Sequence, residues 1–109
     1  MNIEIDRDTV RVTGLPALDR PTAEAFAEQV SAALPPRPET IEVDLAETGK
    51  VDCIGLGALV EVFDQAQRRN RAVTLRVIDP TPPARQLLEL TRLHRIFPVV
   101  QRKKPEAAG

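Results

Sequence analysis

Residues 41–60 run IEVDLAETGKVDCIGLGALV and combine a strand pattern, a loop and the start of a helix. Ile41, Val43 and Leu45 alternate with acidic residues, which is the period of a half-buried strand. Asp52 has the side chain of a helix N-cap, and apolar residues recur at helical spacing from Leu56 onward. A strand that leads through a loop into an amphipathic helix predicts one unit of a layered α/β domain.

The flanking sequence continues this alternation of strand and helix patterns. It predicts strands at 3–5 and 10–12 that form an N-terminal hairpin, a helix at 19–34, strands at 41–45 and 73–78, a helix after position 52, a helix at 84–93 and a short edge strand at 96–100. This order predicts an α/β fold. The sheet is expected to be mixed and mainly parallel, with about five strands and with helices packed on it.

Composition limits the classes of protein to which the chain can belong. Its 109 residues, 42% hydrophobic and 28% charged, predict one globular domain over 1–101 and a charged, flexible tail at 102–109. No apolar run approaches the ~20 residues that span a bilayer, and the N-terminus lacks a signal-peptide pattern. We therefore expect a cytoplasmic protein without direct membrane insertion. One cysteine and one histidine exclude an internal disulfide and a cysteine- or histidine-rich metal site, so we expect no metal and no cofactor.

Charge is distributed unevenly along the chain. Residues 1–64 carry thirteen acids and five bases, a net charge of −8, and residues 65–109 carry three acids and ten bases, a net charge of +7. This division favours a dipolar surface that steers a charged protein partner, with an ordinary solvated face as the alternative. The chain has no Tyr or Trp and only three Phe, so it lacks stacking platforms, and we expect no nucleic-acid binding.

The segment 46–57 resembles several catalytic or cofactor-binding motifs only in part. Gly55-Leu56-Gly57 begins like a dinucleotide fingerprint but lacks the third glycine. The alternative is that these glycines, Gly57 in particular, allow the helix start to pack closely. Cys53 at a helix start could be a nucleophile, but Asp52 opposes a thiolate, so we expect a buried or half-buried small residue there.

The remaining candidates for catalysis are equally weak. Asp44 and Asp52 flank one loop as possible paired carboxylates, with no second feature that indicates acid–base chemistry. His94 lies far along the chain and is expected at the surface or at a helix end. We therefore expect no catalytic residues and no enzymatic activity, although an enzyme acting through Cys53 or through these carboxylates stays open as an alternative.

Three stretches together resemble the STAS domains of bacterial anti-sigma factor antagonists, over nearly all of residues 3–100. They are VTGLPALDRPTAEAF, IEVDLAETGKVDCIGLGALV and LRVIDPTPPARQLLELTRLHRIFPV. The resemblance implies a five-stranded sheet and a regulatory, protein-binding role. Typical members bind an anti-sigma factor that is also a serine kinase, and that kinase phosphorylates the second Ser of an Asp-Ser-Ser-Gly motif.

This chain departs from the family motif at the phosphorylated position. Asp52 and Gly55 match, but Cys53 and Ile54 replace the two serines, so the residue at the phosphoacceptor position has no hydroxyl. Within the loop, Thr48 has the nearest hydroxyl, and it does not match the motif. Arg92 stands where many members have Gly after Leu-Thr.

The resemblance and the motif together predict a non-catalytic partner-binding module. The expected contact residues are Asp52, Cys53, Ile54, Gly55, Leu56 and Gly57, with Ile54 as an apolar anchor. The expected partner is an anti-sigma factor that resembles a serine kinase. The alternative is an accessory subunit that docks on the ATPase of a phospholipid-transport ABC system. Without the serine, regulation would come from expression level, from the partner's state or from oxidation of Cys53.

Overall fold

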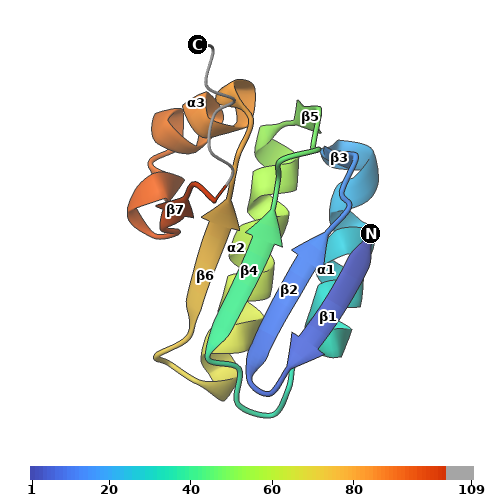
Figure 1. The fold of residues 1–109 in the computed structure, drawn as a ribbon, viewed down its shortest axis with the longest axis vertical. Coiled ribbons are helices and arrows are strands. Elements are labelled where there is room, and N and C mark those ends of the chain that lie inside the picture. Colours follow the sequence, from blue (N-terminus) through green and yellow to red (C-terminus); the bar gives the residue numbers. More distant parts are fainter. Residues whose placement is uncertain (103–109) are drawn as a thin grey trace.

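A five-stranded sheet with strand order β1-β2-β4-β6-β7 forms one layer of the computed structural model, which describes residues 1–102 (Figure 1). Of the expected tail, 103–109 lie outside the described residues. The strands of this sheet are β1 (Asn2–Asp6), β2 (Thr9–Thr13), β4 (Thr40–Asp44), β6 (Thr74–Ile78) and β7 (Val99–Val100). The helices are α1 (Arg20–Ala33), α2 (Cys53–Arg69) and α3 (Pro82–Leu90), followed by a short 3-10 helix at Leu93–Arg95.

The strand directions confirm the predicted mixed, mainly parallel sheet. β1 and β2 form the antiparallel N-terminal hairpin, and β2, β4, β6 and β7 are parallel in that order. The register places Val10, Ile41 and Leu75 side by side across three strands, and it aligns Val43 with Val77 in the same way. Because alternate residues of a strand point to opposite faces, these apolar rows make one face of the sheet hydrophobic.

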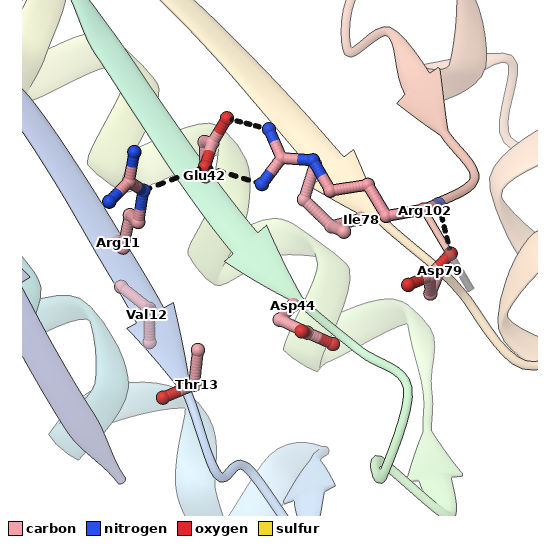
Figure 2. A pocket seen from close by; sticks show the side chains of 8 residues that line it. All are labelled: Arg11, Val12, Thr13, Glu42, Asp44, Ile78, Asp79 and Arg102. Atoms are coloured by element: carbon pink, nitrogen blue, oxygen red, sulfur yellow. Dashed lines mark hydrogen bonds and ion pairs between the residues drawn. The ribbon is translucent and has the colours of Figure 1, made fainter.

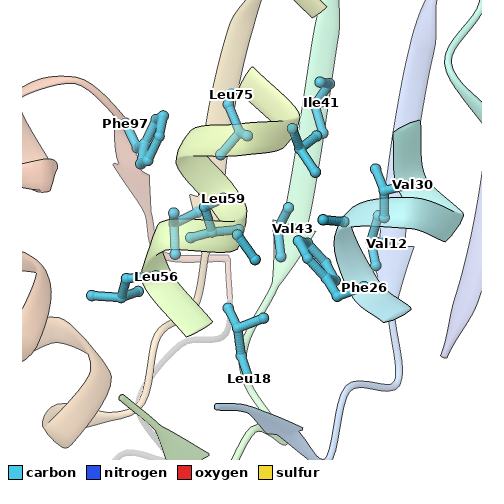
Figure 3. Packing of buried hydrophobic residues seen from close by; sticks show 14 of the residues in the cluster. Val12, Leu18, Phe26, Val30, Ile41, Val43, Leu56, Leu59, Leu75 and Phe97 are labelled. Carbon is cyan, nitrogen blue, oxygen red and sulfur yellow. The ribbon is translucent and has the colours of Figure 1, made fainter. Parts of the chain in front are cut away.

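Helices α1 and α2 cover that hydrophobic face. Both lie on the same side of the sheet, as Figure 1 shows, and they also contact each other. Phe26 of α1 and Leu59 of α2 are fully buried against the valines and isoleucine of the strands (Figure 3). Asp19 is the N-cap of α1, and Leu34 before the two prolines is its C-cap, so the predicted helix is confirmed. No helix of residues 1–102 lies over the opposite face of β1, β2 and β4 in Figure 1.

A second, two-stranded sheet lies beside the start of both helices. It pairs β3 (Ala17–Leu18) with β5 (Lys50–Val51) in parallel, and Gly49 donates a backbone hydrogen bond to the carbonyl of Pro16. This small sheet was not predicted, because strands of two residues are too short to show an alternating pattern. It joins the chain before α1 to the chain before α2.

The prediction of one continuous third helix to Leu93 is wrong. The α-helix ends at Leu90, and Arg92 adopts a left-handed conformation with φ of 61° before the 3-10 helix begins. This is the position at which many STAS domains, which the sequence resembles, have glycine, and a left-handed residue there ends the helix in the way that glycine usually does. The edge strand is present but shorter than predicted, because it begins after Pro98.

Among residues 1–102, no helix has the length and hydrophobicity that crossing a membrane requires.

We predict that Arg92→Gly stabilises the protein by about 1 kcal/mol, because glycine adopts left-handed φ without the steric cost of a Cβ atom. The free energy of unfolding in urea measures the change. Arg92→Ala is the control, since it removes the same charge but keeps the Cβ atom, and it should give no comparable gain. Equal gains in both variants would mean that the charge, and not the backbone, limits stability at this position.

Candidate functional site

Asp52 lies at the junction of the two large helices and binds the first turn of both. It is the N-cap of α2, where its Oδ1 accepts a hydrogen bond from the backbone N–H of Gly55 at 2.8 Å. Its Oδ2 accepts a second bond, at 2.9 Å, from the backbone N–H of Arg20, the first residue of α1. One carboxylate therefore satisfies unpaired donors of two helices at once.

These two hydrogen bonds keep the Asp52 carboxylate charged. The backbone N–H of Gly55, followed by that of Arg20, lowers the pKa of Asp52 below its ordinary value of 3.8. A negative charge is also favourable at the positive end of a helix dipole. The predicted N-cap role of Asp52 is confirmed.

Gly55 packs against the backbone of β3. A Cβ atom built on Gly55 would lie 1.8 Å from the carbonyl oxygen of Leu18, and that oxygen also accepts a hydrogen bond from the N–H of Asp52. A Cβ atom on Gly57 would meet nothing within 4 Å. The expectation that Gly57 in particular serves close packing is therefore wrong, and Gly55 has that role.

The remaining residues of the helix start divide between the surface and the core. Ile54 is 52% exposed, and Cys53 and Gly57 are also exposed, whereas Leu56 is only 1% exposed and belongs to the hydrophobic core. The expectation that Cys53 is buried or half-buried is wrong, because the first residue of α2 faces solvent while the third and fourth turn inward. We call Cys53, Ile54 and Gly57 the helix tip.

The loop before the tip offers no accessible hydroxyl group. Thr48 is the only hydroxyl-bearing residue of segment 46–57, and it is fully buried. Its Oγ1 donates a hydrogen bond to the carbonyl of Leu15 at 2.7 Å. The one hydroxyl of segment 46–57 is thus a structural link between two loops.

A groove runs beside the tip between α1 and α2. Its volume is about 360 Å³, and we call it the acidic groove. Five small or apolar residues and three exposed glutamates line it: Ala23, Ala27, Ile54, Gly57 and Ala58, with Glu24, Glu28 and Glu61. Glu24 and Glu28 lie one helical turn apart, where two like charges disfavour the helix by a few tenths of a kcal/mol. Within residues 1–102, none of the three glutamates forms an ion pair.

A charged cluster on the uncovered face of the sheet was not predicted. Glu42 is only 5% exposed, and its carboxylate accepts hydrogen bonds from Arg11 at 3.2 Å and from Arg102 at 3.0 Å (Figure 2). Arg76 adds an ion pair at 3.8 Å. The register explains the cluster, because Arg11, Glu42 and Arg76 lie side by side on β2, β4 and β6.

This cluster serves structure and does not resemble a catalytic site. Arg102, more than any other residue, lowers the pKa of Glu42 below its ordinary value of 4.5, with a further contribution from Arg11. A carboxylate that is saturated with guanidinium donors is a poor general base. The Arg102 backbone N–H also donates a hydrogen bond to Asp79 at 2.7 Å. Arg102 is therefore held by two contacts, one with Glu42 in β4 and one with Asp79 just after β6. A cavity of about 230 Å³ lies alongside.

The structure gives the other candidate catalytic residues separate roles. Asp44 accepts a hydrogen bond from the backbone of Ala46 at 2.8 Å, while Asp52 caps α2, so the two carboxylates do not form a pair that shares one function. His94 is exposed, as expected, and its Nδ1 lies 3.3 Å from the carbonyl oxygen of Leu88. No group of three potential metal ligands occurs within residues 1–102.

Comparison with known proteins identifies the family. A family model described as "Mlab, STAS domain" matches residues 1–101. The chain therefore belongs to the STAS domain family, as the sequence motifs indicated. A search of curated proteins found no match.

Several solved structures share the fold. The anti-sigma factor antagonist SpoIIAA in its unphosphorylated form has a TM-score of 0.77 at 19% identity, over 97% of this chain and 90% of that one. An anti-sigma factor antagonist from Mycobacterium paratuberculosis has a TM-score of 0.74 at 22% identity, over 90% and 81%. A STAS domain protein from Planctomyces limnophilus has a TM-score of 0.79 at 14% identity, over 94% and 89%. These likenesses confirm the predicted STAS fold.

We predict opposite effects for two glycine substitutions in the first turns of α2. Gly55→Ala should destabilise the protein by about 1–3 kcal/mol, because its methyl group overlaps the Leu18 carbonyl. Gly57→Ala should stabilise it by up to about 1 kcal/mol, because alanine is the better helix former and the space is open. Urea unfolding of both variants measures the difference. A neutral Gly55→Ala would contradict the close approach of α2 to β3.

We predict that Glu42→Gln destabilises the protein by about 1–3 kcal/mol at pH 7, because hydrogen bonds to a charged carboxylate are lost. The lowered pKa of Glu42 means that its contribution is complete above pH 4.5 and is lost as the pH falls through the folded-state pKa. The difference in unfolding free energy between wild type and variant should therefore shrink in acid. Glu39→Gln, at an exposed position, is the control. If the difference in unfolding free energy between wild type and Glu42→Gln did not change with pH, it would contradict an ionised Glu42 in the folded protein.

Proposed function

We propose that the chain is a non-catalytic regulatory module that binds a partner protein in the cytoplasm through the start of α2. The STAS fold supports a regulatory role. The helix tip supplies the contact surface. Asp52, Gly55 and Leu56 fix the position of the tip through the N-cap, the close packing on β3 and the hydrophobic core. This division assigns all six predicted site residues, three to contact and three to support.

The observation that carries this proposal is the exposure of Ile54. A large apolar side chain that is 52% exposed stands on a helix start whose cap and packing are fully satisfied. Apolar side chains on rigid supports are typical anchors of protein interfaces, because little conformational freedom is lost on binding.

Among partners, an anti-sigma factor that resembles a serine kinase agrees with the similar structures. One of them is SpoIIAA in its phosphorylated form, with a TM-score of 0.67 at 20% identity, over 97% of this chain and 94% of that one. In this chain Ile54 lacks a hydroxyl and Thr48 is buried, so phosphorylation of segment 46–57 does not release the partner. We place regulation in the partner's own state or in the amount of this protein.

A second candidate function is an accessory subunit that docks on the ATPase of an ABC transport system. Two observations favour it: the matching family model carries the description "Mlab", and a docking subunit needs no phosphoacceptor at position 54. Neighbouring genes distinguish the candidates. Sigma factor or kinase genes would support the first, and permease and ATPase genes would support the second.

We predict that Ile54→Asp abolishes partner capture in a pull-down from the native cytoplasm. Aspartate places a charge where the wild-type side chain enters an apolar contact, and recovery of the partner should fall by about tenfold or more. Leu90→Asp is the matched control, since Leu90 is 74% exposed on α3. Circular dichroism checks that both variants fold. Equal recovery with wild type and Ile54→Asp would exclude the tip as the contact surface.

A further inference from the structure

We infer that the acidic groove between α1 and α2 receives a basic amphipathic helix of the partner protein; this inference rests on the proposed partner-binding function. The helix would place small apolar side chains on the alanines of the groove and Lys or Arg side chains beside the three glutamates. The groove would then form the larger part of an interface of which the helix tip is one end.

The shape of the groove suits a helix. Ala23, Ala27 and Ala58 are buried and form an apolar floor, and Gly57 has open space above its Cα atom. Residues this small let the backbone of a second helix approach closely. The volume of about 360 Å³ accommodates a few side chains, as expected for one face of a short helix.

The charge of the groove specifies a basic occupant. Glu24 and Glu28 on α1 and Glu61 on α2 are exposed on its rim and have no cationic partner within residues 1–102. A Lys or Arg side chain between Glu24 and Glu28 would remove their mutual repulsion. The same charges repel phosphate groups, so they disfavour a nucleic acid or an anionic membrane in this position.

Two further features orient the occupant. Ile54 belongs to the helix tip and also lines the acidic groove, so the tip and the groove form one continuous surface. The far end of α2 carries Arg68 and Arg69 in its last turn, followed by Arg71. Among the residues that the structure describes, only Arg68 has an acidic partner there, Asp64 at 3.3 Å, so the remaining positive charge would repel a basic helix from that end. A second copy of this chain is a poorer occupant, because inserting its arginine-rich end into the groove would be a head-to-tail contact that does not close into a dimer.

Binding of two synthetic helices tests the inference. The first probe is a fluorescent peptide of about 18 residues, long enough to be helical, with a Leu/Ala face flanked by lysines, and the second replaces every lysine with glutamate. Fluorescence anisotropy at low salt should show that the lysine peptide binds more tightly, by about tenfold or more. Amide shifts in NMR spectra should concentrate on Ala23, Ala27, Ile54, Gly57 and Ala58. No binding of the lysine peptide, or shifts centred elsewhere, would overturn the inference.

Charge reversal supplies the matched variants. The variant Glu24→Lys/Glu28→Lys should no longer bind the lysine peptide and should bind the glutamate peptide instead. Glu39→Lys/Glu89→Lys makes the same change in net charge at exposed positions outside the groove and should behave like wild type. If both double variants lost binding of the lysine peptide equally, the effect would come from net charge and not from the groove, and the inference would be overturned. Concentration-dependent self-association that only the groove variant abolishes would assign the groove to a second copy and would also overturn it.

The cytoplasmic pull-down separates this inference from the proposed function. If Ile54→Asp loses the partner and Glu24→Lys/Glu28→Lys keeps it, the tip binds the partner and the groove does not. If both variants keep it, the proposed function fails. If both variants lose it while Glu39→Lys/Glu89→Lys keeps it, tip and groove form one interface.

Discussion

The carboxylate of Asp52 connects two helix N-termini that are separated by more than thirty positions in the sequence. It accepts one hydrogen bond from Gly55 in α2 and one from Arg20 in α1. Because both helices begin at the same carboxylate, their starts are held together on one edge of the domain. The spacing of the groove between the helices follows from this connection, and so does the direction in which the tip faces.

The sheet beneath the helices has two faces with different physical tasks. On the helix side, the strand register aligns valines, leucines and isoleucines, and burial of this apolar surface drives folding. On the uncovered side, the same register aligns Arg11, Glu42 and Arg76, and Arg102 completes the set. A nearly buried carboxylate needs such donors, since a charge without partners is costly in a shielded position. The second face is thus stabilised by ion pairing without a covering helix.

Much of this fold could be predicted from the sequence, because its strands and helices have strong periodicities. The alternation around Val10–Val12 and Ile41–Val43 indicated the strands, and Asp19 and Asp52 marked both large helix starts. The small sheet of β3 and β5 could not be predicted, since its pairing depends on where the two helices bring the loops. Close packing by the glycines of the helix start was expected, but its assignment to Gly55 and not to Gly57 could not be predicted, because the contact is with the backbone carbonyl of Leu18, which is distant in sequence. The ion pairs of Arg11 and Arg76 with Glu42 depend on strand register, and that of Arg102 depends on the path of the chain after β7, so neither could be predicted from local sequence.

The first turn of α2 contains both surface residues and residues that maintain the fold, and this arrangement has an evolutionary consequence. Cys53 and Ile54 face solvent, whereas their neighbours Asp52, Gly55 and Leu56 maintain the architecture. Mutations can therefore accumulate at these two surface positions without a folding penalty. Under the proposed function, a domain built in this way can diverge in recognition specificity after gene duplication, and new pairings can be engineered by randomising two codons while the cap and core residues stay unchanged.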